Sequence, residues 1–220
     1  MLFRSVLDYA KATGDWNTAV DLWPVVRKQM DLLSAYVGSD GIFVASARSW
    51  VFIDWSDALD RAAAMQGTFV YSLRQALELA RHCGASSEAA KYQRLIGHMT
   101  TAARGAFYDS SRQVFVSGPK RQVSWASQAW MALSGIASPA EAVQAFRTVA
   151  AQNDAVRPGA PYLYHYVAEA MLGCGMKLEA RQLVEAYWGG MVNAGADTFW
   201  EVYDPSNAGL SPYGSVLVNS

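Results

Sequence analysis

Histidine, cysteine and charge are scarce in this sequence, and each scarcity excludes a class of function. The 220 residues include three His and two Cys without CxxC spacing, so we expect buried free thiols and no metal site. Charged residues make up 17%, with a net charge of -1, which excludes the basic surface of a nucleic-acid-binding protein. No apolar run reaches the roughly 18 residues of a membrane span. We therefore expect neither nucleic acid nor a membrane as partner.

Cofactor motifs are missing too, whereas apolar and aromatic residues are abundant. No GxGxxG, Walker, HExxH or GxSxG pattern occurs, and we expect no cofactor. Apolar residues make up 52% of the chain, which excludes disorder and indicates a large core. Eight Trp and eleven Tyr are more than a core requires, so we expect some of them at a binding surface.

Apolar residues recur at helical spacing almost throughout, which predicts eight helices in four antiparallel hairpins. Short loops with glycine join the helices of each pair, and Ser138 with Glu141 forms a predicted capping box. β-like stretches occur at 42–44, 50–53, 113–116 and 121–123, the last two around a predicted turn at 117–120. The predicted helices are 1–13 with 16–37, 58–83 with 87–107, 123–134 with 139–152, and 160–173 with 177–192.

Short loops within hairpins and long aromatic loops between them are typical of an α/α toroid, in which the long loops build the site. A complete (α/α)6 toroid needs twelve helices. We therefore predict an all-α fold in which residues 1–220 form one partial (α/α)6 domain with about four of six hairpins. The alternative is a smaller, self-contained helical toroid or solenoid.

Segment 195–205, Gly-Ala-Asp-Thr-Phe-Trp-Glu-Val-Tyr-Asp-Pro, places acids among aromatic residues outside the helical periodicity. In an extended segment Glu201 shares a face with Phe199 and Tyr203, whereas Trp200 points the other way. A carboxyl among aromatic rings suits acid–base chemistry. We take Glu201 as the candidate catalytic residue and Trp200 as a candidate binding residue. The alternative is that Glu201 pairs with an Arg at the end of a strand.

A second cluster, Trp-Val-Phe-Ile-Asp-Trp-Ser-Asp at 50–57, combines aromatic rings with carboxylates. Carbohydrate sites use rings that stack on sugar faces and carboxylates that accept hydrogen bonds from hydroxyls. Trp50, Asp54 and Trp55 are therefore candidate binding residues. The alternative is that Asp54 or Asp57 caps the next helix; we assign this cap to Ser56 or Asp57.

The start of the seventh helix supplies two more candidates for the same rim, Tyr162 and His165. A helix N-terminus disfavours the charged imidazolium, so His165 is expected to act as a neutral hydrogen-bonding group. A structural role for this histidine is the alternative. Trp125 and Gln128, just after the predicted turn, either line the cavity or belong to the core.

Three segments together resemble a known family: Phe-Ile-Asp-Trp at 52–55, Tyr-Trp-Gly-Gly-Met at 187–191, and segment 195–205. In this order they resemble the six-hairpin catalytic domain of bacterial α-L-rhamnosidases of glycoside hydrolase family 78. The resemblance implies an (α/α)6 barrel that cleaves terminal α-L-rhamnosides with inversion. It also implies Glu201 as general base on water and Asp54 as a ligand of sugar hydroxyls. The implied partner is a carbohydrate substrate.

The resemblance further implies that parts of the catalytic domain lie outside the chain. The family's acidic, Arg-containing segment with the general acid is not found, nor is the His-containing stretch that follows the Ser-Pro-Tyr-Gly region, here at 211–214. We therefore expect the 220 residues alone to be inactive. Two other functions remain open: a sugar epimerase on a similar toroid, and a non-catalytic carbohydrate-binding toroid. Without a visible signal peptide, periplasmic, secreted and cytoplasmic bacterial locations also stay open.

Overall fold

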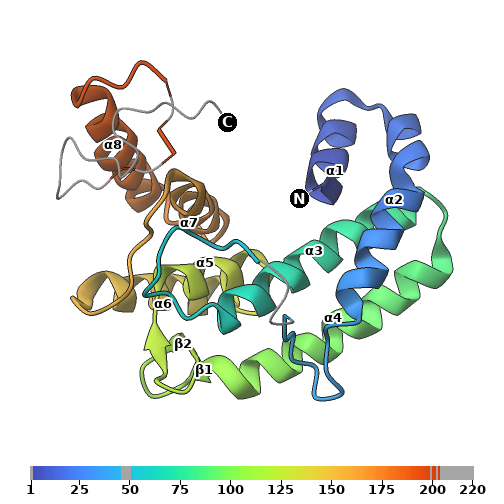
Figure 1. The fold of residues 1–220 in the computed structure, drawn as a ribbon, viewed down its shortest axis with the longest axis horizontal. Coiled ribbons are helices and arrows are strands. Elements are labelled where there is room, and N and C mark those ends of the chain that lie inside the picture. Colours follow the sequence, from blue (N-terminus) through green and yellow to red (C-terminus); the bar gives the residue numbers. More distant parts are fainter. Residues whose placement is uncertain (1, 46–50, 199, 202, 204–220) are drawn as a thin grey trace. The chain divides into compact units, whose positions relative to one another are not determined.

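The chain forms two compact units, which are described separately. The computed structural model describes residues 2–45, 51–198, 200, 201 and 203. The first unit comprises residues 1–51 and 65–107, and the second comprises residues 52–64 and 108–220. Figure 1 shows their elements in chain order.

Two helical hairpins make up most of the first unit. Their helices are α1 (Leu2–Thr13), α2 (Trp16–Ser34), α3 (Ala62–His82) and α4 (Ser86–Phe107). Asp15 caps α2, because its carboxylate accepts a hydrogen bond from the backbone N–H of Thr18 at 3.2 Å. Gly84 between α3 and α4 has a φ of 69°, a left-handed conformation that favours glycine. An ion pair of 2.7 Å between Lys91 and Asp31 connects α4 to α2.

A buried glutamine ties the first unit together. Gln66 of α3 accepts a hydrogen bond from the N–H of Phe43 at 2.8 Å. Its amide nitrogen donates to the carbonyl oxygens of Gly41 at 2.9 Å and Met99 at 3.1 Å. One fully buried side chain thus satisfies three backbone groups and holds the loop after α2 against α3 and α4.

The second unit combines a small sheet with several helices (Figure 1). Its elements are β1 (Tyr108–Asp109), β2 (Val114–Ser117), β3 (Gln122–Val123), α5 (Trp125–Leu133), α6 (Pro139–Ala151), α7 (Pro161–Gly173) and α8 (Lys177–Asn193). The strands are antiparallel in the order β1-β2-β3, with Tyr108 opposite Phe115 and Val116 opposite Val123. Helix α5 packs against α6 and α7, and α7 packs against α8.

Gln128 of α5 plays the same structural role in the second unit. Its amide exchanges hydrogen bonds of 2.9 and 2.8 Å with the backbone of Phe115 and donates to the carbonyl of Ser124 at 2.9 Å. The side chain is buried and fully used by the backbone. It therefore joins β2 to α5 rather than lining a cavity.

The predicted start of the third helix is wrong, and the reason lies in a tertiary contact. Helix α3 begins at Ala62 instead of residue 58. Asp60, not Ser56 or Asp57, accepts from the first helical N–H at 3.1 Å. The hydroxyl of Ser117 donates to the Asp60 carboxylate at 2.5 Å and accepts from the next helical N–H at 3.0 Å. A side chain from β2 thus completes this cap.

Other local predictions fare better. Among the described residues, the helices other than α3 lie close to their expected bounds, the turn at 117–120 joins β2 to β3, and the capping box is present, with bonds of 2.9 and 3.3 Å. The stretch 42–44 contributes one bridge, from Phe43 to Val37, and 51–53 forms no strand. Both cysteines are free but half-buried instead of buried. Within the described ranges, every helix is too short or too polar to cross a membrane.

Candidate functional site

The candidate site lies in the second unit, around Asp54. This residue is 1% exposed, and its Oδ2 accepts a hydrogen bond of 2.6 Å from the N–H of Gly159, in the loop before α7. A Cβ at residue 159 would collide with the carbonyl oxygen of Trp55. Glycine is therefore needed at 159, because the two loops approach each other backbone to backbone.

The environment of Asp54 makes its carboxyl easier to protonate than a free aspartate, although the group stays mostly ionised at pH 7. Burial raises the pKa of the carboxyl to about 6, although the backbone N–H groups of Gly159, Trp55 and Ala160 and the charge of Arg61 lower it. The second oxygen, Oδ1, is buried and has no hydrogen-bond partner among the described residues. A buried polar atom in this state is costly unless a ligand or water satisfies it.

This pKa predicts a pH-dependent stability. The folded chain holds a proton on Asp54 between about pH 4 and 6 that the unfolded chain releases, so the contribution of Asp54 to stability is greatest below pH 4 and declines as the pH rises through 6. At 1.4 kcal/mol per pH unit the decline amounts to about 3 kcal/mol. Asp54→Asn removes this titration. In urea unfolding, the free energy of unfolding of the variant relative to that of the parent should rise by about 3 kcal/mol between pH 4 and pH 7. A difference that does not change with pH would contradict the prediction.

An aromatic cluster includes the chain neighbours of Asp54. The ring centroid of Phe52 lies 5.1 Å from that of Trp55 and 5.1 Å from that of Tyr162. Tyr162 in turn contacts Tyr166 at 5.1 Å. Trp55 and Tyr162 remain 43% and 38% exposed, which leaves ring surface available to a ligand. Two predicted binding residues from segments far apart in the sequence thus belong to one aromatic cluster next to Asp54.

A second cluster packs the residues that follow α8 against that helix. Tyr187, Met191 and Tyr203 form its buried centre, and Trp200 is among the half-buried residues packed against it. Burial first, then Tyr164 and Asp54, raises the pKa of the Tyr187 phenol, so this cluster lies within electrostatic range of Asp54. Glu201 is half-buried and sits in the chain between Trp200 and Tyr203.

Two further predicted site residues have side-chain contacts of their own, and a third is not described. His165 has a side chain 60% exposed and lies 3.6 Å from the Glu169 carboxylate, one helical turn along α7. Trp125 is half-buried with its ring against Phe146 of α6, at 6.2 Å between centroids. Trp50 lies outside the described residues.

The other two histidines also have partners of their own. His82 stacks on Trp16 with 3.6 Å between ring centroids, and Nε2 of His98 lies 3.2 Å from the carbonyl oxygen of Ser39. Neither of these contacts involves a second histidine. Within the part of the chain that the structure describes, no group of three His, Cys, Asp or Glu could hold a metal ion.

Sequence reasoning missed two residues that build the site. Gly159 donates to Asp54, and its only sequence signal is its place in Arg-Pro-Gly-Ala-Pro at 157–161, where proline and glycine mark a turn. Tyr187 fixes the tail segment, since its hydroxyl donates to the Tyr203 carbonyl at 3.0 Å. It stood in the Tyr-Trp-Gly-Gly-Met string without an assigned role.

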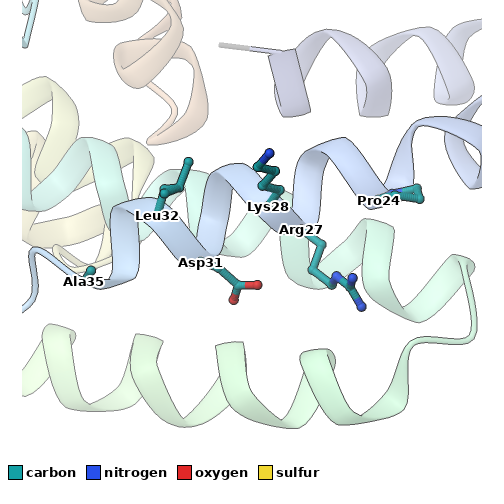
Figure 2. Close-up of a pocket in the computed structure, with 6 residues that line it drawn as sticks. All are labelled: Pro24, Arg27, Lys28, Asp31, Leu32 and Ala35. Atoms are coloured by element: carbon teal, nitrogen blue, oxygen red, sulfur yellow. The ribbon is translucent and has the colours of Figure 1, made fainter.

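A hollow in the first unit is not part of this site. It measures about 410 Å³ and runs along α2. Figure 2 shows its residues pointing in different directions from the helix. Arg27 and Asp31 are engaged by Glu88 and Lys91 of α4, at 3.5 and 2.7 Å. The lining residues are Pro24, Arg27, Lys28, Asp31, Leu32 and Ala35.

Comparisons with known proteins agree with the predicted resemblance and fold class. In solved structures the chain is similar to a rhamnosidase from Klebsiella oxytoca with rhamnose bound, at 38% identity and a TM-score of 0.90 over 99% of this chain and 42% of that one. A GH78 family rhamnosidase of Bacillus sp. GL1 is 19% identical, with a TM-score of 0.80 over 91% and 22% of the two chains, and shows the fold alone. No match was found among curated proteins.

The chain thus spans less than half the length of either structural relative. The family model described as the bacterial alpha-L-rhamnosidase 6 hairpin glycosidase domain matches residues 6–212. This match covers nearly the whole sequence and both segments that build the candidate site. The chain therefore belongs to the family of the bacterial α-L-rhamnosidase six-hairpin glycosidase domain.

Proposed function

We propose that this chain is part of a glycoside hydrolase that cleaves terminal α-L-rhamnosides with inversion of the anomeric centre. One observation carries the proposal within the family: Asp54 has a buried Oδ1 without a partner among the described residues, and its chain neighbour Trp55 belongs to a partly exposed aromatic cluster with Phe52 and Tyr162. An unsatisfied carboxylate oxygen next to ring surfaces suits a sugar, which offers hydroxyl donors and an apolar face. The bound rhamnose of the Klebsiella oxytoca relative supports this sugar class.

In this proposal Glu201 is the general base that removes a proton from the attacking water. Asp54 accepts hydrogen bonds from sugar hydroxyls, and Trp55, Tyr162 and Trp200 supply ring surfaces. His165 reaches the substrate from the exposed start of α7, while Trp50 and Trp125 stay predictions from the sequence. Inversion needs a second carboxyl about 6.5–9.5 Å from the base. We propose that this general acid comes from outside the 220 residues.

Exposed apolar side chains on the helices support the presence of further helical hairpins packed against them. Among the described residues, exposed large apolar side chains on helices lie on α1, α2, α7 and α8, the first and last hairpins. We propose that further hairpins of the six-hairpin domain pack there, because such surface is seldom left open on a soluble domain. These side chains, apart from Tyr162, are Tyr9, Val20, Val25, Leu32, Leu172, Leu178, Val184 and Val192.

The test is hydrolysis of an aryl α-L-rhamnoside, followed by NMR of the first sugar anomer released. We expect β-L-rhamnose from a protein that contains the additional hairpins and no turnover from the 220 residues alone. Release of the α-anomer would contradict inversion, and turnover by the 220 residues would place the general acid within them. Sugar binding in calorimetry without turnover by the larger protein would favour the non-catalytic alternative.

A further inference from the structure

The chain reverses direction directly after α8 and returns to the same helix. Gly195 follows the last turn with a φ of 93°, and the N–H of Ala196 donates to the carbonyl of Met191 at 3.0 Å. Further along, Tyr203 packs against the last two turns of α8 and is only 7% exposed. The residues between these two points include Glu201.

Tyr203 is seated on α8 by three contacts. Its ring meets the ring of Tyr187 edge-on, with 5.4 Å between centroids. The hydroxyl of Tyr187 donates to the backbone carbonyl of Tyr203 at 3.0 Å. The hydroxyl of Tyr203 lies over Gly190, where an added Cβ would come within 2.6 Å of the oxygen and 3.2 Å of the ring.

Glycine at 190 has no backbone reason to be there. Residue 190 lies inside α8 without a positive φ, and glycine weakens a helix interior relative to alanine. Its neighbour Gly189, in the same helix, has open space where a Cβ would stand. The position of the Tyr203 ring accounts for the glycine at 190 alone.

A shift of the Tyr203 ring would also displace Glu201, two positions earlier in the chain, and Trp200, whose ring it contacts. Trp200 lies 5.7 Å from Tyr203, ring centroid to ring centroid, and both pack on the cluster around Tyr187. We propose that Gly190 is a positioning residue: by leaving room for Tyr203 on α8, it sets the place of the Glu201 carboxylate. This inference rests on the proposed role of Glu201 as general base.

The test compares Gly190→Ala with the matched control Gly189→Ala, in the protein that hydrolyses the rhamnoside. Because a misplacement of about 1 Å can cost up to 10²-fold in rate, we expect Gly190→Ala to lower kcat about tenfold or more, with KM nearly unchanged. Gly189→Ala should keep both constants. Hydrogen exchange of the peptide 196–203, followed by mass spectrometry, should quicken in the first variant only.

Rescue separates positioning from general damage. Tyr203→Phe removes the hydroxyl that the new Cβ would meet, so adding it to Gly190→Ala should restore most of the kcat relative to Tyr203→Phe alone. If Gly190→Ala does not fold, Tyr187→Phe tests the same packing of Tyr203 on α8, since it removes only the hydrogen bond to the Tyr203 carbonyl. That variant should quicken exchange of 196–203 and lower kcat several-fold.

Equal kcat values for the two glycine variants, unchanged exchange of 196–203, or a missing rescue would each overturn the inference. Absence of rhamnoside hydrolysis by the parent protein would instead overturn the proposed function. In that case hydrogen exchange of 196–203 in the two glycine variants still reports on the packing of Tyr203 against α8, so the two failures are distinguishable.

Discussion

Glu201→Gln is expected to lower kcat for an aryl α-L-rhamnoside by about 10²- to 10⁴-fold, the range that a positioned general base contributes. Glutamine keeps the size of the side chain but cannot accept a proton from the attacking water. KM should change little, since the proposed role of Glu201 is toward water rather than the sugar. Initial rates across a range of substrate concentrations, measured in the protein with the additional hairpins, give both constants.

The matched control for this variant is Glu185→Gln on α8. Glu185 is exposed and pairs with Arg181 one turn away, at 2.6 Å. An exposed pair of this kind contributes little to stability, so the kcat of this variant should equal that of the parent. Full activity in Glu201→Gln would refute the assignment of the base, and the sequence alternative, pairing of Glu201 with an Arg, would then be preferred.

Asp54→Asn is expected to raise KM for the rhamnoside by about 10- to 100-fold, because a hydrogen bond to a charged group contributes about 1.5–3 kcal/mol. Asparagine retains an oxygen for the N–H of Gly159, which donates to Asp54 at 2.6 Å. It carries no negative charge toward the sugar hydroxyls. A rise in KM that exceeds the fall in kcat is the signature of a binding residue, and direct calorimetry with rhamnose should show the same loss.

Asp57→Asn provides the comparison for this prediction. Asp57 lies three positions further along the same loop and is exposed, so the variant changes the same chemistry outside the proposed site. We expect its KM to match the parent. An unchanged KM in Asp54→Asn would limit Asp54 to its structural bond with Gly159 and remove the observation on which the proposed sugar site depends.

Local sequence signals predicted most of the secondary structure. Helical spacing, the capping box at Ser138 and glycine after the helices are properties of neighbouring residues, and the structure confirms them. The start of α3 was wrong, because the hydroxyl of Ser117 supports the Asp60 cap from another strand. The role of Gln128 was left open for the same reason, since its partner Phe115 lies on β2.

Family and fold class were predictable because both depend on strings that lie together in the chain, such as Phe-Ile-Asp-Trp at 52–55. The string at 52–55 also indicated Asp54 and Trp55, and the start of the seventh helix indicated Tyr162. Only the tertiary structure brought Asp54 to Gly159, 105 positions away, and Tyr203 to Gly190. Both glycines are explained by what occupies the space of their missing side chains. A close approach between distant segments leaves no periodic pattern in the sequence, so the folded structure alone determines it.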